Sequence, residues 1–68
     1  MDFQEKARIQ IEHWMEHNVN HEAEYERFAE QLDKEGFTGA AENIRELVRL
    51  TKEGTRSLQM ALSSLKAE

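Results

Sequence analysis

Residues 37–65, "FTGAAENIRELVRLTKEGTRSLQMALSSL", decide the fold, because small or apolar side chains recur in them at alternating spacings of four and three residues. That spacing is the heptad pattern of a helix that packs along another helix. The positions that follow it are Phe37, Ala41, Ile44, Val48, Thr51, Thr55, Leu58, Leu62 and Leu65. Leu47, Leu50 and Ala61 widen this stripe on one side, so we expect the helix to contact more than one neighbour.

The first half of the chain carries a second stripe with helical spacing, which turns polar in its middle. Its positions are Phe3, Ala7, Ile11, Trp14, Asn18, His21, Tyr25, Phe28 and Leu32. We interpret Trp14, Tyr25 and Phe28 as core residues, since aromatic side chains at helical spacing usually pack inside. Asp2 is a suitable N-cap and Gly36 a suitable residue after the last turn, so the pattern predicts a helix over about 2–35. The alternative is two shorter helices with a break near "NVN", residues 18–20.

The loop between the two stripes predicts an antiparallel hairpin of the all-α class. With a turn at 36–38 and a second helix over about 39–66, Thr38 would cap that helix and Glu42 would lie in its first turn. So short a connection places the helices side by side, and residues whose numbers add up to about 74 then face each other. Trp14 would lie near Met60, and the polar positions of the first helix would lie near 51–56. The whole chain, 1–68, is expected to form one domain.

The length of the chain argues for self-association. Two helices of this size bury one interface, and a 68-residue chain is only marginally stable alone. Small domains are usually supplemented by disulfides, a metal or oligomerisation, and the sequence has no cysteine. We therefore expect a homo-oligomer, a dimer in which two hairpins form a four-helix bundle with two-fold symmetry.

Charge and hydropathy narrow the possible partners and the location. Residues 1–35 carry four Lys and Arg against ten Asp and Glu, while residues 36–68 carry five against four. An acidic half beside a faintly basic half favours their pairing and argues against nucleic acid as a partner. Since the chain has neither a long apolar run nor the pattern of a secretion signal, we expect no membrane partner and a cytoplasmic protein.

The segment "HWMEHNVNH", residues 13–21, holds the chemically most informative side chains. His13, His17 and His21 follow one another at intervals of four residues, and successive members are rotated by about 40° around a helix. A histidine pair at this spacing can chelate zinc, nickel or cobalt, and Glu24 lies on the same side as His17. The predicted metal residues are therefore His17 and His21, with His13 and Glu24 as further candidates. A pair alone is incomplete, but a two-fold dimer could supply ligands from the partner.

A second interpretation of the same segment stays open. Asn18 and His21 can instead form a hydrogen-bonded polar layer with Thr51 and Thr55, which would fix the register of the helices as a buried asparagine does in coiled coils. In that case no metal or other cofactor is needed, and the chain is a purely structural oligomerisation domain.

Motifs for catalysis are missing from the sequence. The di-iron bundle signature requires Glu three residues before a histidine, and the residues in that position are Gln10, Trp14 and Asn18. The sequence has no glycine-rich phosphate loop, and "GFTG", residues 36–39, is better interpreted as a turn between helices. We expect a binding or assembly module and not an enzyme.

The order Trp14-x-x-His17-Asn18-x-x-His21, followed by Tyr25, Phe28-Ala29, Gly36 and a second long helix, resembles a small helical domain of archaeal and bacterial proteins from nickel and cobalt uptake loci. The similarity extends over nearly the whole chain, and "W-x-x-H-N-x-x-H" is its most specific part. What the resemblance implies is an association with metal in which Trp14, His17, Asn18 and His21 are the positions of interest.

Overall fold

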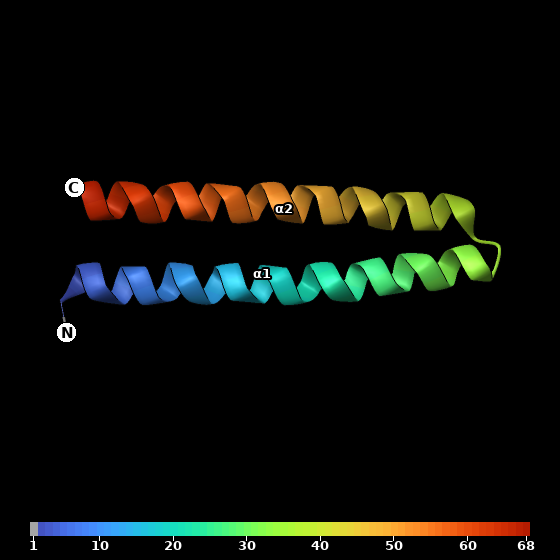
Figure 1. Cartoon of the computed structure of the whole chain (residues 1–68), viewed down its shortest axis with the longest axis horizontal. Coiled ribbons are helices and arrows are strands. Elements are labelled where there is room, and N and C mark those ends of the chain that lie inside the picture. The colour runs from blue at the N-terminus through green and yellow to red at the C-terminus, as the bar shows by residue number, and fades with distance from the viewer. Residues whose placement is uncertain (1) are drawn as a thin grey trace.

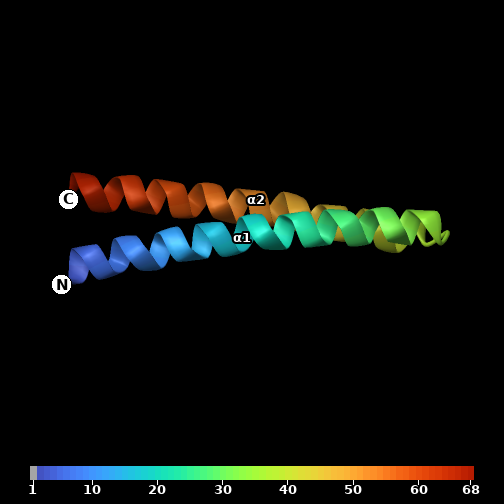
Figure 2. The same ribbon diagram turned by 60° about the horizontal axis from the view of Figure 1, so that its bottom comes forward.

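The protein is an all-helical hairpin (Figure 1). A computed structural model describes residues 2–68, and Met1, the first residue of the predicted domain, lies outside the described residues. Helix α1 spans Phe3–Lys34 and helix α2 spans Thr38–Ala67, so both differ from the predicted bounds by one residue at each end. The two views in Figures 1 and 2 show the helices side by side and antiparallel, crossing at a shallow angle, with both chain ends at the same end of the rod.

Helix α1 begins and ends where its capping residues predict. The Asp2 side chain accepts a hydrogen bond of 2.8 Å from the Glu5 amide, which satisfies one of the free N–H groups of the first turn. After Lys34 the chain reverses at Gly36, which has φ +89°, and the Phe37 amide donates to the Leu32 carbonyl at 2.8 Å. The helix is continuous through residues 18–20, so the predicted alternative of a break there is wrong.

The start of helix α2 differs from the prediction. Phe37 is the N-cap and makes no side-chain hydrogen bond, and Thr38 is already the first helical residue. Glu42 accordingly lies beyond the first turn, which contains no acidic side chain. The reason is that the glycine at 36 completes the reversal early, and the Phe37 carbonyl then accepts the first bond of the new helix, from Ala41.

The seam between the two helices confirms every second position of the predicted stripe of α1 and differs from it at the positions between, where Met15, Glu22 and Ala29 take the places predicted for the residues before them. The buried and half-buried positions on this helix that follow a heptad are Ile11, Met15, Asn18, Glu22, Tyr25, Ala29 and Leu32. Trp14 and Phe28, predicted as core, are 49% and 51% exposed, because the adjacent residues Met15 and Ala29 occupy the seam instead. The seam of α2 follows its predicted heptad from Ala41 to Leu65, while Phe37 is exposed.

Full or nearly full burial in the seam is limited to small side chains among the described residues. Ala29 and Ala41 are fully buried near the turn, Val48 is 6% exposed, and no large side chain is fully buried among the described residues. The polar middle faces the α2 segment predicted for it, since Asn18 Nδ2 lies 3.8 Å from the position that a Cβ would take on Gly54. Met60, which was predicted to face Trp14, lies on the outer side of α2 and is 62% exposed.

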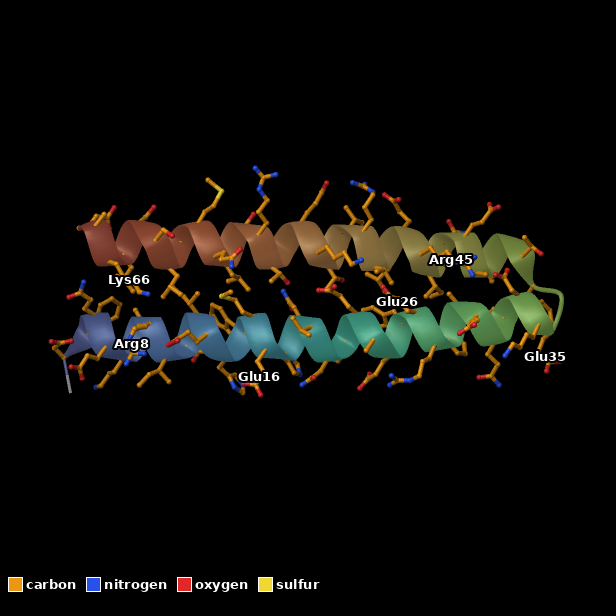
Figure 3. The ribbon with its side chains drawn as sticks, viewed as in Figure 1. Arg8, Glu16, Glu26, Glu35, Arg45 and Lys66 are labelled. Carbon is orange, nitrogen blue, oxygen red and sulfur yellow. The ribbon has the colours of Figure 1, made fainter. Side chains whose placement is uncertain are left out.

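Ion pairs tie the helices together along one side of the seam. Arg45 of α2 binds Asp33 of α1, and Lys52 Nζ lies 3.6 Å from Glu26 Oε1. Figure 3 shows Glu26 in the space between the helices, whereas Glu16 lies on the side of α1 that is turned away from α2. These side chains are largely exposed, so each pair contributes at most about 1 kcal/mol to stability.

Two glycines provide a matched test of the turn. Replacing Gly36 by Ala is expected to lower the free energy of unfolding by about 1–2 kcal/mol, because φ is positive there. Gly39→Ala is the control, since an added Cβ has open space at both positions but Gly39 is helical, and there the change should stabilise by up to about 1 kcal/mol. Urea unfolding at one protein concentration measures both, and equal effects would contradict the turn geometry.

The buried alanine of α1 provides a test of the seam register. Ala29→Leu is expected to destabilise by about 1–3 kcal/mol, because a larger side chain would force the helices apart at a fully buried position. Ala23→Leu is the control, since Ala23 is exposed and a surface change of this kind should stay within about 0.5 kcal/mol. If Phe28 and not Ala29 occupied the seam, the first variant would be tolerated as well as the second.

Candidate functional site

The middle of α1 brings two of the three histidines into contact. His17 Nε2 and His21 Nε2 are 3.2 Å apart, and the two rings meet edge to face with centroids 4.3 Å apart. The His13 ring lies 6.2 Å from that of His17 and faces the outer groove that it lines with Lys6, Ile9 and Gln10. The structure therefore pairs His17 with His21 and leaves His13, a predicted metal residue, outside the pair.

The separation of the two nitrogens suits two kinds of chemistry. Two imidazole ligands of a tetrahedral zinc ion, each bonded at 2.0–2.1 Å, have nitrogens about 3.3 Å apart. The same distance also fits a hydrogen bond in which one neutral imidazole donates its Nε2 proton to the other. In either case one lone pair at least points into the space between the rings.

Glu24 lies next to the other nitrogen of His21. Its Oε2 atom is 3.5 Å from His21 Nδ1, a buried atom that has no hydrogen bond within the described chain. A carboxylate in this position favours the tautomer that carries its proton on Nδ1, which leaves the lone pair of Nε2 free. Glu24 is thus placed to orient the imidazole from behind, whereas the sequence suggested it as a ligand.

The predicted polar layer across the seam is not formed by hydrogen bonds. Thr51 Oγ1 donates to the Leu47 carbonyl at 2.8 Å and Thr55 Oγ1 to the Thr51 carbonyl at 3.1 Å, so both hydroxyls bond to the preceding turn of their own helix. Within residues 2–68 neither Asn18 nor His21 makes a hydrogen bond to α2, and Asn18 is only half-buried against Gly54. Both polar residues are therefore available for other contacts.

Charged side chains elsewhere in residues 2–68 form ion pairs on the surface. Arg49 forms ion pairs with both Glu46 and Glu53 on the outer face of α2. The hydrogen bond that Arg49 donates to the Glu46 carboxylate lowers the pKa of Glu46 from its ordinary value. The pKa of Arg45 is raised by its hydrogen bond to Asp33. Pairs like those of Arg49, three or four residues apart on one helix, stabilise that helix modestly.

Large apolar side chains gather on the side of the hairpin opposite the cross-helix ion pairs. Successive residues of a helix are rotated by 100° about its axis. By this measure Trp14, Phe28 and Phe3 lie about 50–90° to one side of the seam of α1. Leu47 and Leu50 lie about 60–120° from the seam of α2, in the same direction of rotation. In two antiparallel helices, residues that are rotated from the seam in the same direction lie on the same face of the hairpin. The ion pairs Arg45–Asp33 and Lys52–Glu26 show this for the opposite direction and the opposite face. We call the surface formed by Phe3, Trp14, Phe28, Leu47 and Leu50 the apolar face; each is 38–80% exposed.

The paired histidines lie within this arrangement. His21 is rotated about 70° toward the apolar face, between Trp14 and Phe28 along the helix, and His17 lies at its edge. One end of the face is hollowed into a shallow groove of about 370 Å³, lined by Phe3, Lys6, Ala7, Gln10, Ile11 and Trp14. The sequence predicted a further contact surface at Leu47 and Leu50, but it did not reveal the whole apolar face, because its members on α1 were assigned to the seam.

The comparison with protein families covers almost the whole hairpin. The chain belongs to the family DUF8180, a domain of unknown function. The family model matches residues 7–65, which include all three histidines and most of both helices. No curated protein and no solved structure has significant similarity to the chain. The predicted link to nickel and cobalt uptake loci therefore stays a prediction. Neither α1 nor α2 contains an apolar stretch long enough to cross a membrane.

The half-buried asparagine of the seam can be tested by replacement with an apolar side chain of similar size. Asn18→Leu is expected to raise the free energy of unfolding by about 1–2 kcal/mol, because it removes a polar amide without a hydrogen-bond partner from a partly apolar surface. Asn18→Ala is the control for side-chain size. Thermal unfolding of both variants measures the effect, and a loss of stability in the leucine variant would indicate that the amide has a partner in the assembled protein.

Proposed function

We propose that the protein is a non-enzymatic assembly module in which two hairpins associate through their apolar faces into a four-helix bundle. The observation that supports this most directly is the contrast between what is buried and what is exposed. Among residues 2–68, two alanines and one valine are buried, while nine large apolar side chains are 38–80% exposed. A folded domain normally needs two layers of secondary structure around a core, and a rod 10 Å thick between its outermost Cα atoms has one.

The hairpin exposes more surface than a compact protein of its mass. A compact protein of 8.0 kDa is expected to expose about 4,450 Å². The hairpin exposes 5202 Å², roughly 750 Å² more, so a large part of its surface can be buried by association with a partner. A second copy is the favoured occupant, since it is a partner always present at the same concentration and closed two-fold pairing is the commonest form of self-association.

The side chains around the apolar face are compatible with such pairing. Of the charged residues in α1, only Lys6 and Glu24 are rotated toward this face, so it is close to neutral although residues 1–35 carry a net charge of −6. The acidic excess lies on the outer and ion-paired sides. Two copies can therefore approach without strong repulsion, and a function in metal association through the α1 histidines is compatible with the same assembly.

A matched pair of surface substitutions tests the interface. Leu50→Arg is expected to convert the dimer to a species with the 8.0 kDa mass of one chain and to lower its helical content, because burying an unpaired guanidinium costs several kcal/mol. Met60→Arg is the control: Met60 is 62% exposed but lies on the outer side of α2, so mass and melting temperature should be unchanged. Light scattering with circular dichroism measures both, and a stable wild-type monomer at tens of micromolar would refute the proposal.

A further inference from the structure

We propose that a divalent transition metal binds on the two-fold axis of this dimer, held by the Nε2 atoms of His17 and His21 from each copy. The inference rests on the proposed dimer and assigns a ligand to it. An ion that prefers imidazole nitrogen in a tetrahedral site is required, and zinc is the clearest case. Glu24 of each chain would act as a positioning residue, holding the His21 ring by its Nδ1 proton.

A single hairpin cannot complete such a site. The 3.2 Å between the two Nε2 atoms matches the spacing of two ligands on one zinc ion, but His13 is too far from the pair to be a third. Among the residues that the structure describes, no group of three or more His, Asp or Glu side chains could hold a metal ion. Two copies of the pair supply the four nitrogens that a closed tetrahedral site needs.

The position of the pair along the helix determines whether the two copies can meet. The middle of α1, Phe3–Lys34, falls between Asn18 and Val19, so His17 and His21 lie on either side of it by about 2 and 4 Å along the axis. If the two-fold axis crosses the helices at this point, α1 of one copy lies antiparallel over α1 of the other. Each histidine pair then lies over its counterpart. An axis parallel to the helices would instead place the pairs diagonally across the bundle.

The groove on the apolar face favours the crossing axis. In that arrangement, residues of the two α1 helices whose numbers add up to about 37 lie at one level. The partner's Phe28 therefore comes level with residue 9, in the centre of the groove between Phe3 and Trp14. With an axis parallel to the helices, the groove would instead face small side chains near Ala61 and Ser64 of the partner, and Phe28 would find no recess.

The α2 helices fit together in the same arrangement. The Asn18–Gly54 contact sets the level of the axis near Gly54, so residues of the two α2 helices whose numbers add up to about 107 lie opposite. Leu47 then comes level with the partner's Met60, next to the partner's Ala61, and Leu50 comes level with the partner's Ser57, next to the partner's Leu58. Leu47 and Leu50 of one copy therefore lie near small or apolar side chains of the other. Gly54, which lies near the axis, permits close approach of the two α2 backbones. The central gap between Trp14 and its counterpart is left to the histidines.

Charge also favours a cation at this point. Four neutral imidazoles carry no charge to offset a dication, but the two Glu24 carboxylates next to His21 of each copy supply two negative charges close by. No arginine or lysine of α1 is rotated toward the apolar face within two turns of the pair. The site thus combines neutral nitrogen ligands with a compensating shell of carboxylates, the common composition of histidine metal sites.

Zinc titration of untagged protein by calorimetry, after treatment with a chelator, tests the inference. The expected result is one zinc per two chains, with binding lost in His17→Ala and in His21→Ala and kept in the matched control His13→Ala. Glu24→Gln is expected to weaken zinc binding about 10- to 100-fold without abolishing it. Circular dichroism of each variant establishes that it is folded, and the stoichiometry of the wild type needs no variant.

The mass of each protein in the presence of chelator separates this inference from the proposed function. Three results with a dimeric wild type would overturn the shared site: no uptake of zinc, uptake of one zinc per chain, or undiminished zinc binding by the His21→Ala variant. Each of them would leave the proposed assembly module standing. A wild-type monomer with and without zinc would overturn both. His17→Ala should remain a dimer in chelator, since the apolar face and not the metal is expected to hold the copies together.

Discussion

A single layer of two helices has no interior, and this constraint governs everything else in the molecule. Each helix of the hairpin can bury only the narrow strip that faces its neighbour, and within that strip full burial is reached at the small side chains of Ala29 and Ala41. Large side chains in that strip, such as Ile44 and Leu58, are only half-buried, and others, such as Trp14, lie to one side of it. The opposite side is occupied by ion pairs such as Arg45–Asp33, so the apolar residues collect on one face. The face is therefore a consequence of how the seam is packed.

The helices and their connection could be predicted from the sequence because they depend on local chemistry. The cap at Asp2 and the reversal at Gly36 each require one residue type in one backbone conformation, and both are observed. The heptad of α2 could also be assigned, since its apolar positions have few competitors. Thr38 was a less reliable signal, because a threonine can occupy the first helical position as readily as the cap, and the cap at Phe37 uses no side chain.

Only every second position of the α1 seam could be assigned from the sequence, because at the positions between them two adjacent sets of residues compete. One set contains Trp14, His21 and Phe28, and the other contains Met15, Glu22 and Ala29. Hydrophobicity favours the first set, but close packing against the small residues of α2 favours the second. The conflict arises because a sequence pattern does not state whether an aromatic stripe faces the first neighbouring helix or a later one. The contact of His17 with His21 was accessible from their spacing, whereas the place of Glu24 behind the ring depended on side-chain geometry.

Assembly and metal binding are coupled in the arrangement proposed for this chain. Since the four nitrogens belong to two copies, every ion bound favours the dimer over its separated chains, and by linkage every factor that favours the dimer raises the apparent affinity for the ion. The apolar face and the histidine pair therefore act on one equilibrium although they share few atoms. Without cysteine, a short helical chain has no disulfide to supplement its core, so a second copy and an ion at the axis are the supplements open to it. His17 and His21 lie at the middle of α1, at a level where neither Trp14 nor Phe28 fills the space between the two copies. An ion bound there would link the copies at that level and would fix their register.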